Sequence, residues 1–159
     1  MSTKADYTQE EWEMLVKSPL MAAMAVVAAS PSGPIGALKE MFAVSKGMLE
    51  GAEGTTNPLI GALVADVKAG ARPAMPTERP HDLAQLKSQA LGACRDVAAL
   101  LGRKAPGDAE GFKRWLLGVA QRAAEAAKEG GFLGIGGVQV SEAERTALAE
   151  VTQALGVTA

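Results

Sequence analysis

Histidine and cysteine are the side chains that most often perform acid–base, nucleophilic or metal chemistry, and this chain has one of each, His81 and Cys94. A single histidine excludes an HExxH zinc site, a Cys/His zinc site and the paired E-x-x-H motifs of a di-iron bundle. His81 stands between Pro80 and Asp82, which predicts a solvated loop or helix start and not a catalytic base. Cys94 falls on an apolar helix face, which favours a buried, inert thiol. We therefore predict that the protein is not an enzyme and uses no cofactor.

Residues 130–137, GGFLGIGG, are a second candidate for chemistry, because glycines expose backbone N–H groups that can bind phosphate. The glycine order is G-x-x-G-x-G-G, with no buried strand before it and no G-K-[ST] after it, which argues against a nucleotide site. We interpret the segment as a tight elbow between two helices, with Phe132, Leu133 and Ile135 packed under the bundle. The alternative is that these three side chains are exposed and contact a partner or a membrane.

Carboxylates are the third candidate, because hard cations bind to carboxylate oxygens. The acidic residues on the inner margins of the expected helices are Asp66, Asp96, Glu125 and Glu129. Their spacing does not require a metal, and solvation or pairing with Lys and Arg is the default interpretation.

Methionines recur at roughly helical steps in the first half of the chain, at Met14, Met21, Met24, Met41 and Met48. Such adaptable side chains favour core filling. The alternative is a pliable groove for an apolar ligand or a partner helix, with Met24 and Met41 as candidate contacts.

Helices must position all these residues, because apolar side chains recur at three- and four-residue steps along most of the chain. We expect a short helix from Thr8, with Tyr7 packed on Trp12, and further helices at 19–29, 34–49, 58–67, 83–101, 108–129 and 142–155. The helix at 34–49 should turn Leu38, Met41, Phe42, Ser45 and Leu49 inward. Leu83 should begin the inward stripe of the helix at 83–101. Residues 102–107 should close that helix. The expected caps are two boxes, Thr8 with Glu11 and Ser141 with Glu144, and single N-caps at Ser18, Asn57 and Asp108.

The composition supports an all-α fold, because aromatic residues make up only 4% of the chain and alanine is the best helix former. The near balance of 16 basic and 18 acidic residues argues against binding to nucleic acid. One cysteine fits a reducing compartment, and we expect a cytoplasmic protein. Residues 18–38 carry no charge, but the cluster SPSGP at 30–34 breaks the run after about a dozen helical residues, too few for a transmembrane segment.

The two halves of the chain resemble each other. A shift of 70 positions places residues such as Ser18 and Val27 on Ser88 and Val97, and a shift of 75 places Gly36 on Gly111. We predict a single helical domain over residues 1–159, a bundle of about six or seven helices, with possible repeat halves at 7–70 and 81–156 and a proline-rich linker at 70–80. If the duplication is real, the halves pack around a pseudo-twofold axis.

Two segments of the chain resemble a family of uncharacterised bacterial all-helical proteins. They are DYTQEEWEMLVKSPLMAAMAVVAASPSGPIGALKEMFAVSKGM and WLLGVAQRAAEAAKEGGFLGIGGVQVSEAERTALAEV. That resemblance implies no assigned activity. Residues 119–156 are also similar to TerB-like tellurite-resistance domains, with matches at Glu129, Gly130, Ser141 and Glu144, and with Glu129-Gly130 in place of the Asp-Gly of the turn. The TerB-like resemblance implies an all-helical domain linked to metal-ion binding, for which Glu129 and Glu144 are the candidate ligands.

The expected function is a non-catalytic helical interaction or stress-associated module that binds another protein or itself. One alternative is a carrier of an apolar small molecule or lipid in the bundle interior. A second alternative is a TerB-like metal-ion sensing domain.

Overall fold

The computed structural model describes residues 2–29, 43–73, 81–129 and 142–158, and all regular secondary structure within these ranges is helical. The elements are η1 (Lys4–Asp6), α1 (Gln9–Val27), a helical segment at 43–51, α3 (Pro58–Lys68), α4 (Leu83–Lys104), α5 (Pro106–Glu129) and α6 (Glu142–Leu155). The prediction of an all-α bundle is confirmed. No helix in the described ranges is long and apolar enough to cross a membrane.

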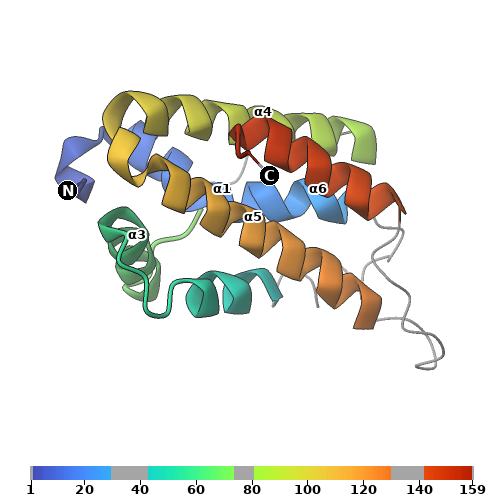
Figure 1. Cartoon of the computed structure of the whole chain (residues 1–159), viewed down its shortest axis with the longest axis horizontal. Helices are drawn as coiled ribbons and strands as arrows, with labels where there is room; N and C mark the ends of the chain where they lie inside the picture. The colour runs from blue at the N-terminus through green and yellow to red at the C-terminus, as the bar shows by residue number, and fades with distance from the viewer. Residues whose placement is uncertain (1, 30–42, 74–80, 130–141, 159) are drawn as a thin grey trace.

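The helix α1 is the centre of the bundle. It runs behind α4, α5 and α6 in Figure 1 and contacts each of them as well as α3. Its sequence explains this position, because small and apolar residues cover it on all sides from Ser18 to Val26. Every long helix and the segment 43–51 contribute to one buried cluster, whose largest fully buried side chains include Phe112, Leu15 and Leu59.

The start of α1 follows the sequence prediction. The Thr8 hydroxyl accepts from the Glu11 backbone N–H at 3.2 Å, and the Glu11 carboxylate accepts from the Thr8 N–H at 2.9 Å. The rings of Tyr7 and Trp12 lie 5.9 Å apart between centroids, so the predicted staple is also confirmed.

The predicted helix boundary at Ser18 is wrong, because α1 continues through Pro19. Proline has no N–H to donate to the carbonyl four residues earlier, which belongs to Leu15. The buried Ser18 hydroxyl donates to that carbonyl instead, at 2.6 Å. Ser18 therefore repairs the hydrogen bond that Pro19 removes, and the helix does not end.

The turn between α4 and α5 is shorter than expected. The helix α4 runs to Lys104, and Ala105 alone separates it from α5, which Pro106 opens. Residues 102–107 therefore do not form the predicted loop, and Asp108 lies in the first turn of α5 and not at its N-cap. Proline suits a first helical position because the N–H that it lacks would have no helical partner there.

The segment 43–51 docks on α5 through its glycines. Its buried positions are Val44, Gly47 and Met48, whereas Leu49 is 37% exposed, so the predicted inward stripe through Ser45 and Leu49 is wrong. The Arg122 guanidinium donates to the Gly47 carbonyl at 2.7 Å, and the Trp115 indole donates to the Met48 carbonyl at 3.3 Å. A Cβ at position 47 would lie 3.0 Å from the Arg122 side chain, so glycine leaves the space that this side chain occupies.

Asn57 caps α3 as predicted, and its side chain also ties α3 to α5. Its Oδ1 accepts from the N–H groups of Leu59 and Ile60, and its Nδ2 donates to the Asp108 carbonyl at 2.9 Å. The last helices of the two halves, α3 and α6, have different neighbours. The helix α3 packs on η1, α1 and α5, whereas α6 packs on α4, α1 and α5. The predicted pseudo-twofold symmetry is not confirmed and stays a prediction.

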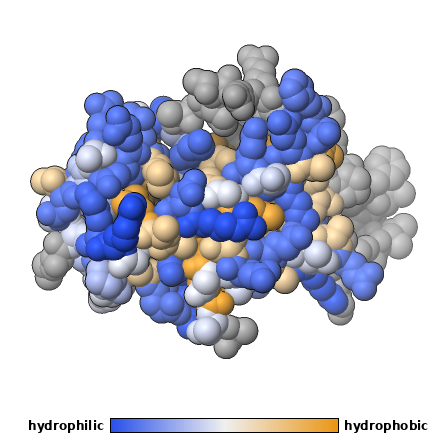
Figure 2. Space-filling view, turned by 90° about the horizontal axis from the view of Figure 1, so that it is seen from above, coloured by the Kyte–Doolittle hydropathy of each residue, from blue (hydrophilic) through white to orange (hydrophobic). Residues whose placement is uncertain are grey.

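The side of the molecule over α4 is mainly hydrophilic, with hydrophobic residues scattered between charged ones (Figure 2). Leu83, at the start of α4, is 58% exposed, so its predicted inward position is wrong. Further along α4 the predicted face is confirmed, since Leu91, Cys94, Val97 and Leu101 are buried.

Candidate functional site

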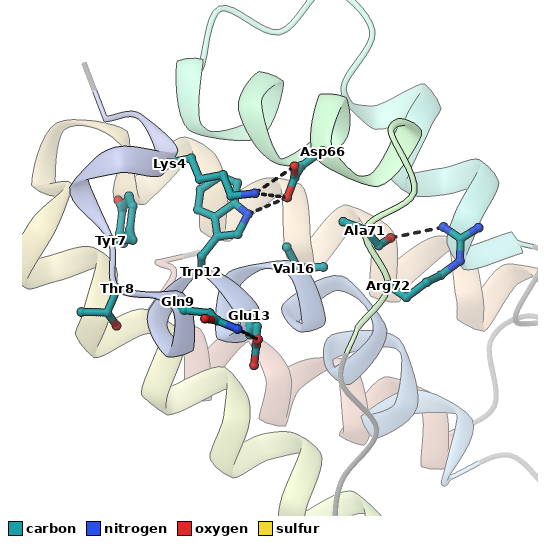
Figure 3. Close-up of a pocket in the computed structure, with 10 residues that line it drawn as sticks. All are labelled: Lys4, Tyr7, Thr8, Gln9, Trp12, Glu13, Val16, Asp66, Ala71 and Arg72. Carbon is teal, nitrogen blue, oxygen red and sulfur yellow. Dashed lines mark hydrogen bonds and ion pairs between the residues drawn. The ribbon is translucent and has the colours of Figure 1, made fainter.

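An open groove of about 460 Å³ lies where η1 and the first half of α1 approach α3 and residues 71–72 (Figure 3). Its walls combine aromatic, charged and amide side chains. The residues that line it are Lys4, Tyr7, Thr8, Gln9, Trp12, Glu13, Val16, Asp66, Ala71 and Arg72.

Three of these side chains converge in the groove from three different elements. Asp66 of α3 accepts from the Trp12 indole N–H of α1 at 2.8 Å. The Lys4 ammonium of η1 donates to both oxygens of the same carboxylate, at 3.0 and 2.9 Å (Figure 3). Lys4 also lies over the Trp12 ring, 5.7 Å from its centroid, within the distance of a cation–π contact.

This arrangement stabilises the ionised form of Asp66. The Trp12 hydrogen bond, followed by the Lys4 hydrogen bond and charge, lowers the pKa of the Asp66 carboxyl from its ordinary value near 3.8. The groove therefore carries a fixed carboxylate beside an aromatic face.

Tyr7 and Lys104 hold the N-terminal side of the groove in place. The Lys104 ammonium donates to the Asp6 carbonyl at 3.0 Å and pairs with the Glu11 carboxylate at 2.6 Å. It also lies 5.5 Å from the centroid of the buried Tyr7 ring. Burial raises the pKa of the Tyr7 hydroxyl, because a phenolate is poorly solvated there. The end of α4 thus anchors η1 against α1.

Several polar groups of the groove are already hydrogen-bonded within the chain. Its lining includes no histidine or cysteine, and the Thr8 hydroxyl already serves as a helix cap. Gln9 donates to Glu13 at 3.0 Å, and the exposed Arg72 guanidinium donates to the neighbouring Ala71 carbonyl at 3.2 Å.

A second, smaller hollow of about 240 Å³ lies between α1 and α4. Met14, Met21 and Ala93 form its apolar part, and Glu10, Glu13, Lys17 and Asp96 form its charged part. Met24 packs against the core nearby on α1, which agrees with core filling.

The residues singled out for chemistry are spread over several elements. His81 is exposed beside the start of α4, where its backbone N–H donates to Gln85 Oε1 at 2.6 Å. The predicted position at a helix start is therefore confirmed. Cys94 is buried, and burial raises its thiol pKa to about 11. Asp66 and Asp96 line different hollows, and Glu125 is exposed. Glu144 is only 5% exposed, yet no group of three or more His, Cys, Asp or Glu that could hold a metal occurs in the described ranges.

Several candidate residues lie outside what the structure describes. These are Met41, Phe132, Leu133, Ile135 and the side chain of Glu129. The predictions about a hydrophobic elbow, a methionine groove at Met41 and a metal ligand at Glu129 stay predictions.

Sequence reasoning missed the meeting of Lys4, Trp12 and Asp66. Trp12 and Asp66 are 54 positions apart, and Lys4 and Asp66 are 62 apart, so no local spacing relates them. The available signal was Trp12 itself, because a buried indole N–H requires a hydrogen-bond acceptor.

In comparisons with protein-family models, curated proteins and solved structures, none matches this chain. The resemblances to a bacterial helical family and to TerB-like domains therefore stay predictions. The class that the structure defines is an all-α helical bundle with an open polar groove.

Proposed function

We propose that the protein is a non-catalytic interaction module that binds another protein, or a second copy of itself, through the groove between η1, α1 and α3. The observation that carries this proposal is the convergence of Lys4, Trp12 and Asp66 on an open groove of about 460 Å³. Tryptophan and arginine are enriched where proteins bind one another, and this groove contains both types in Trp12 and Arg72. We further infer a cytoplasmic location from the single buried cysteine.

The framework around the groove supports a binding role because contacts within the chain fix its walls. These contacts are the capping box of α1, the Lys104 bonds and the Trp12–Asp66 hydrogen bond. A preformed site loses less conformational entropy on binding than one that must be ordered by its ligand.

Affinity capture and sedimentation would test the proposal. The purified chain is used as bait in lysate from its source, and its association state is measured by sedimentation velocity. Arg72→Ala should reduce partner recovery or self-association, because it removes an exposed guanidinium at the groove. Arg95→Ala is the matched control, since Arg95 is an exposed arginine on α4 that lines neither hollow. A strict monomer with no specific partner, or equal effects of the two substitutions, would contradict the proposed role.

A second candidate function is transport of an apolar small molecule or lipid. The supporting observation is the hollow between α1 and α4, where Met14 and Met21 provide an adaptable apolar surface. Native mass spectrometry of the purified protein would detect a bound ligand by its added mass. A spectrum showing only the bare chain would argue against a carrier.

A further inference from the structure

We propose that the groove is a binding site for a lysine or arginine side chain of a partner protein, and that Lys4 occupies this site as an internal ligand. The inference rests on the proposed function and names the chemistry of its contact. A basic side chain of the partner would displace the Lys4 ammonium from Asp66 and from the face of Trp12.

The position of Lys4 shows that the site accepts a cation. Its ammonium is within 3.0 Å of both Asp66 oxygens and 5.7 Å from the Trp12 ring centroid. A carboxylate beside an aromatic face combines charge-assisted hydrogen bonds with a cation–π contact, and both interactions favour ammonium and guanidinium groups.

The receiving groups are fixed independently of Lys4. Trp12 and Asp66 lie within two regular helices, α1 and α3, and the indole N–H holds the carboxylate at 2.8 Å. Removing the Lys4 side chain therefore leaves the acceptor and the ring in place. By contrast, Lys4 belongs to a three-residue helix, η1, that contains no buried residue.

Lys4 is also poorly held. Its side chain is 59% exposed, whereas that of Asp66 is 25% exposed. Exposed ion pairs contribute little because water and salt screen them. The backbone of η1 has its own anchors, namely the Thr3–Asp6 hydrogen bonds and the Lys104 bond to the Asp6 carbonyl. Only the Lys4 side chain needs to move for the site to become vacant.

The charges around the vacant site favour a cation as its occupant. Without Lys4, the described residues that line the groove carry two carboxylates, Asp66 and Glu13, and one guanidinium, that of Arg72. Figure 3 shows that this guanidinium lies beyond Ala71 and points away from Asp66, so it does not occupy the place of the Lys4 ammonium.

The test is a titration with a capped Gly-Ser pentapeptide that carries one central lysine, followed by NMR of the two tryptophan indole N–H signals. A norleucine version of the peptide controls for apolar contacts. The Trp12 signal reports on the site because its N–H donates to Asp66, whereas the Trp115 signal is an internal reference that donates to the Met48 carbonyl. Lys4→Ala should bind the lysine peptide about two- to sixfold more tightly than the natural chain, because a weakly held competing occupant is gone.

Two further variants make the result decisive. Adding Asp66→Asn to Lys4→Ala should abolish the shift of the Trp12 signal. Lys46→Ala should leave the affinity at that of the natural chain, since Lys46 is a 75% exposed lysine paired with Glu50 elsewhere. The inference is overturned if Lys4→Ala binds no better than the natural chain, if the norleucine peptide binds equally, or if Asp66→Asn has no effect. If the peptide does not bind but a partner is still captured and lost on Arg72→Ala, the cation site alone is refuted. If the peptide binds but no partner is captured, the interaction role is refuted.

Discussion

The Ser18–Pro19 step inside α1 allows a sharp test of how this helix tolerates a proline. Pro19 removes the backbone donor for the Leu15 carbonyl, and the Ser18 hydroxyl replaces it at 2.6 Å. Both Ser18 and Leu15 are buried, at 2% and 0% exposed. We therefore expect Ser18→Ala to leave the Leu15 carbonyl without a partner in a site that water does not reach.

The cost follows from desolvation of that carbonyl. A buried polar group that loses its partner costs about 1–3 kcal/mol, of which the better helix propensity of alanine returns about 0.5 kcal/mol or less. For a chain of this length, each kcal/mol lowers the melting temperature by about 2–4 °C, so we expect a decrease of about 1–12 °C. In a Pro19→Ala background, residue 19 regains an N–H that can donate to Leu15. The same Ser18→Ala change should then cost less than about 0.5 kcal/mol.

The assay is a double-mutant cycle measured by urea unfolding and thermal melting followed by circular dichroism. The expected coupling between positions 18 and 19 is about 1–3 kcal/mol. Ser88→Ala is the control, because Ser88 is an exposed serine in α4 that no proline follows, and it should change stability by less than about 0.5 kcal/mol. Additive effects of Ser18→Ala and Pro19→Ala would refute the proposed repair of the hydrogen bond.

Three other predictions concern α5, Asp66 and Cys94. Gly111→Ala should destabilise the fold by about 1 kcal/mol or more, because its Cβ would lie 2.9 Å from Asn57 Nδ2 and displace the α3 cap. Gly118→Ala is the control: its Cβ would have no neighbour within 4 Å, so it should stabilise the fold by about 0.5–1 kcal/mol in the same urea titration. The Asp66 pKa is lowered in the folded state, so the contribution of Asp66 to stability is present above its ordinary pKa near 3.8 and is lost as pH falls through the folded pKa. Asp66→Asn should therefore make melting temperatures between pH 5 and pH 2.5 less pH-dependent. An unchanged slope would contradict this prediction. Because burial raises the Cys94 pKa to about 11, Ellman's reagent at pH 8 should react with this thiol only after denaturant is added, and rapid labelling of the native chain would show that the site opens.

Local patterns predicted the helices and several of their caps, because these depend on neighbours in the sequence. Thr8 with Glu11 and Asn57 before Pro58 are examples that the structure confirms. The same logic failed at Ser18. A serine followed by a proline looks the same in the sequence whether it begins a helix or lies inside one and replaces the missing hydrogen bond. Burial of α1 among its neighbours selects the second outcome, and burial is a tertiary property.

Packing faces were harder to predict where small or terminal residues are involved. The segment 43–51 turns Gly47 inward, where its carbonyl accepts from Arg122, and leaves Leu49 outward. Leu83 continues the apolar period of α4 but lies at its first residue, where it stays 58% exposed. Hydrophobic spacing gives no weight to glycine and does not indicate where a neighbouring helix ends.

The candidate site was beyond local reasoning for a different reason. Its three central residues belong to η1, α1 and α3, and only the packing of α3 beside α1 brings Asp66 to Trp12. Sequence analysis placed Asp66 among possible metal ligands, whereas the structure gives it an indole and an ammonium as partners.

Two side chains of α5 bind main-chain carbonyls of the segment 43–51. Arg122 and Trp115 donate to the carbonyls of residues 47 and 48, and glycines at 47 and 51 allow the approach. Every residue type has a carbonyl, so these two hydrogen bonds do not depend on the outward side chain at position 49. Substitutions of Leu49 can change the surface that the segment presents to other molecules while these two hydrogen bonds stay in place, so this position can acquire new surface specificity.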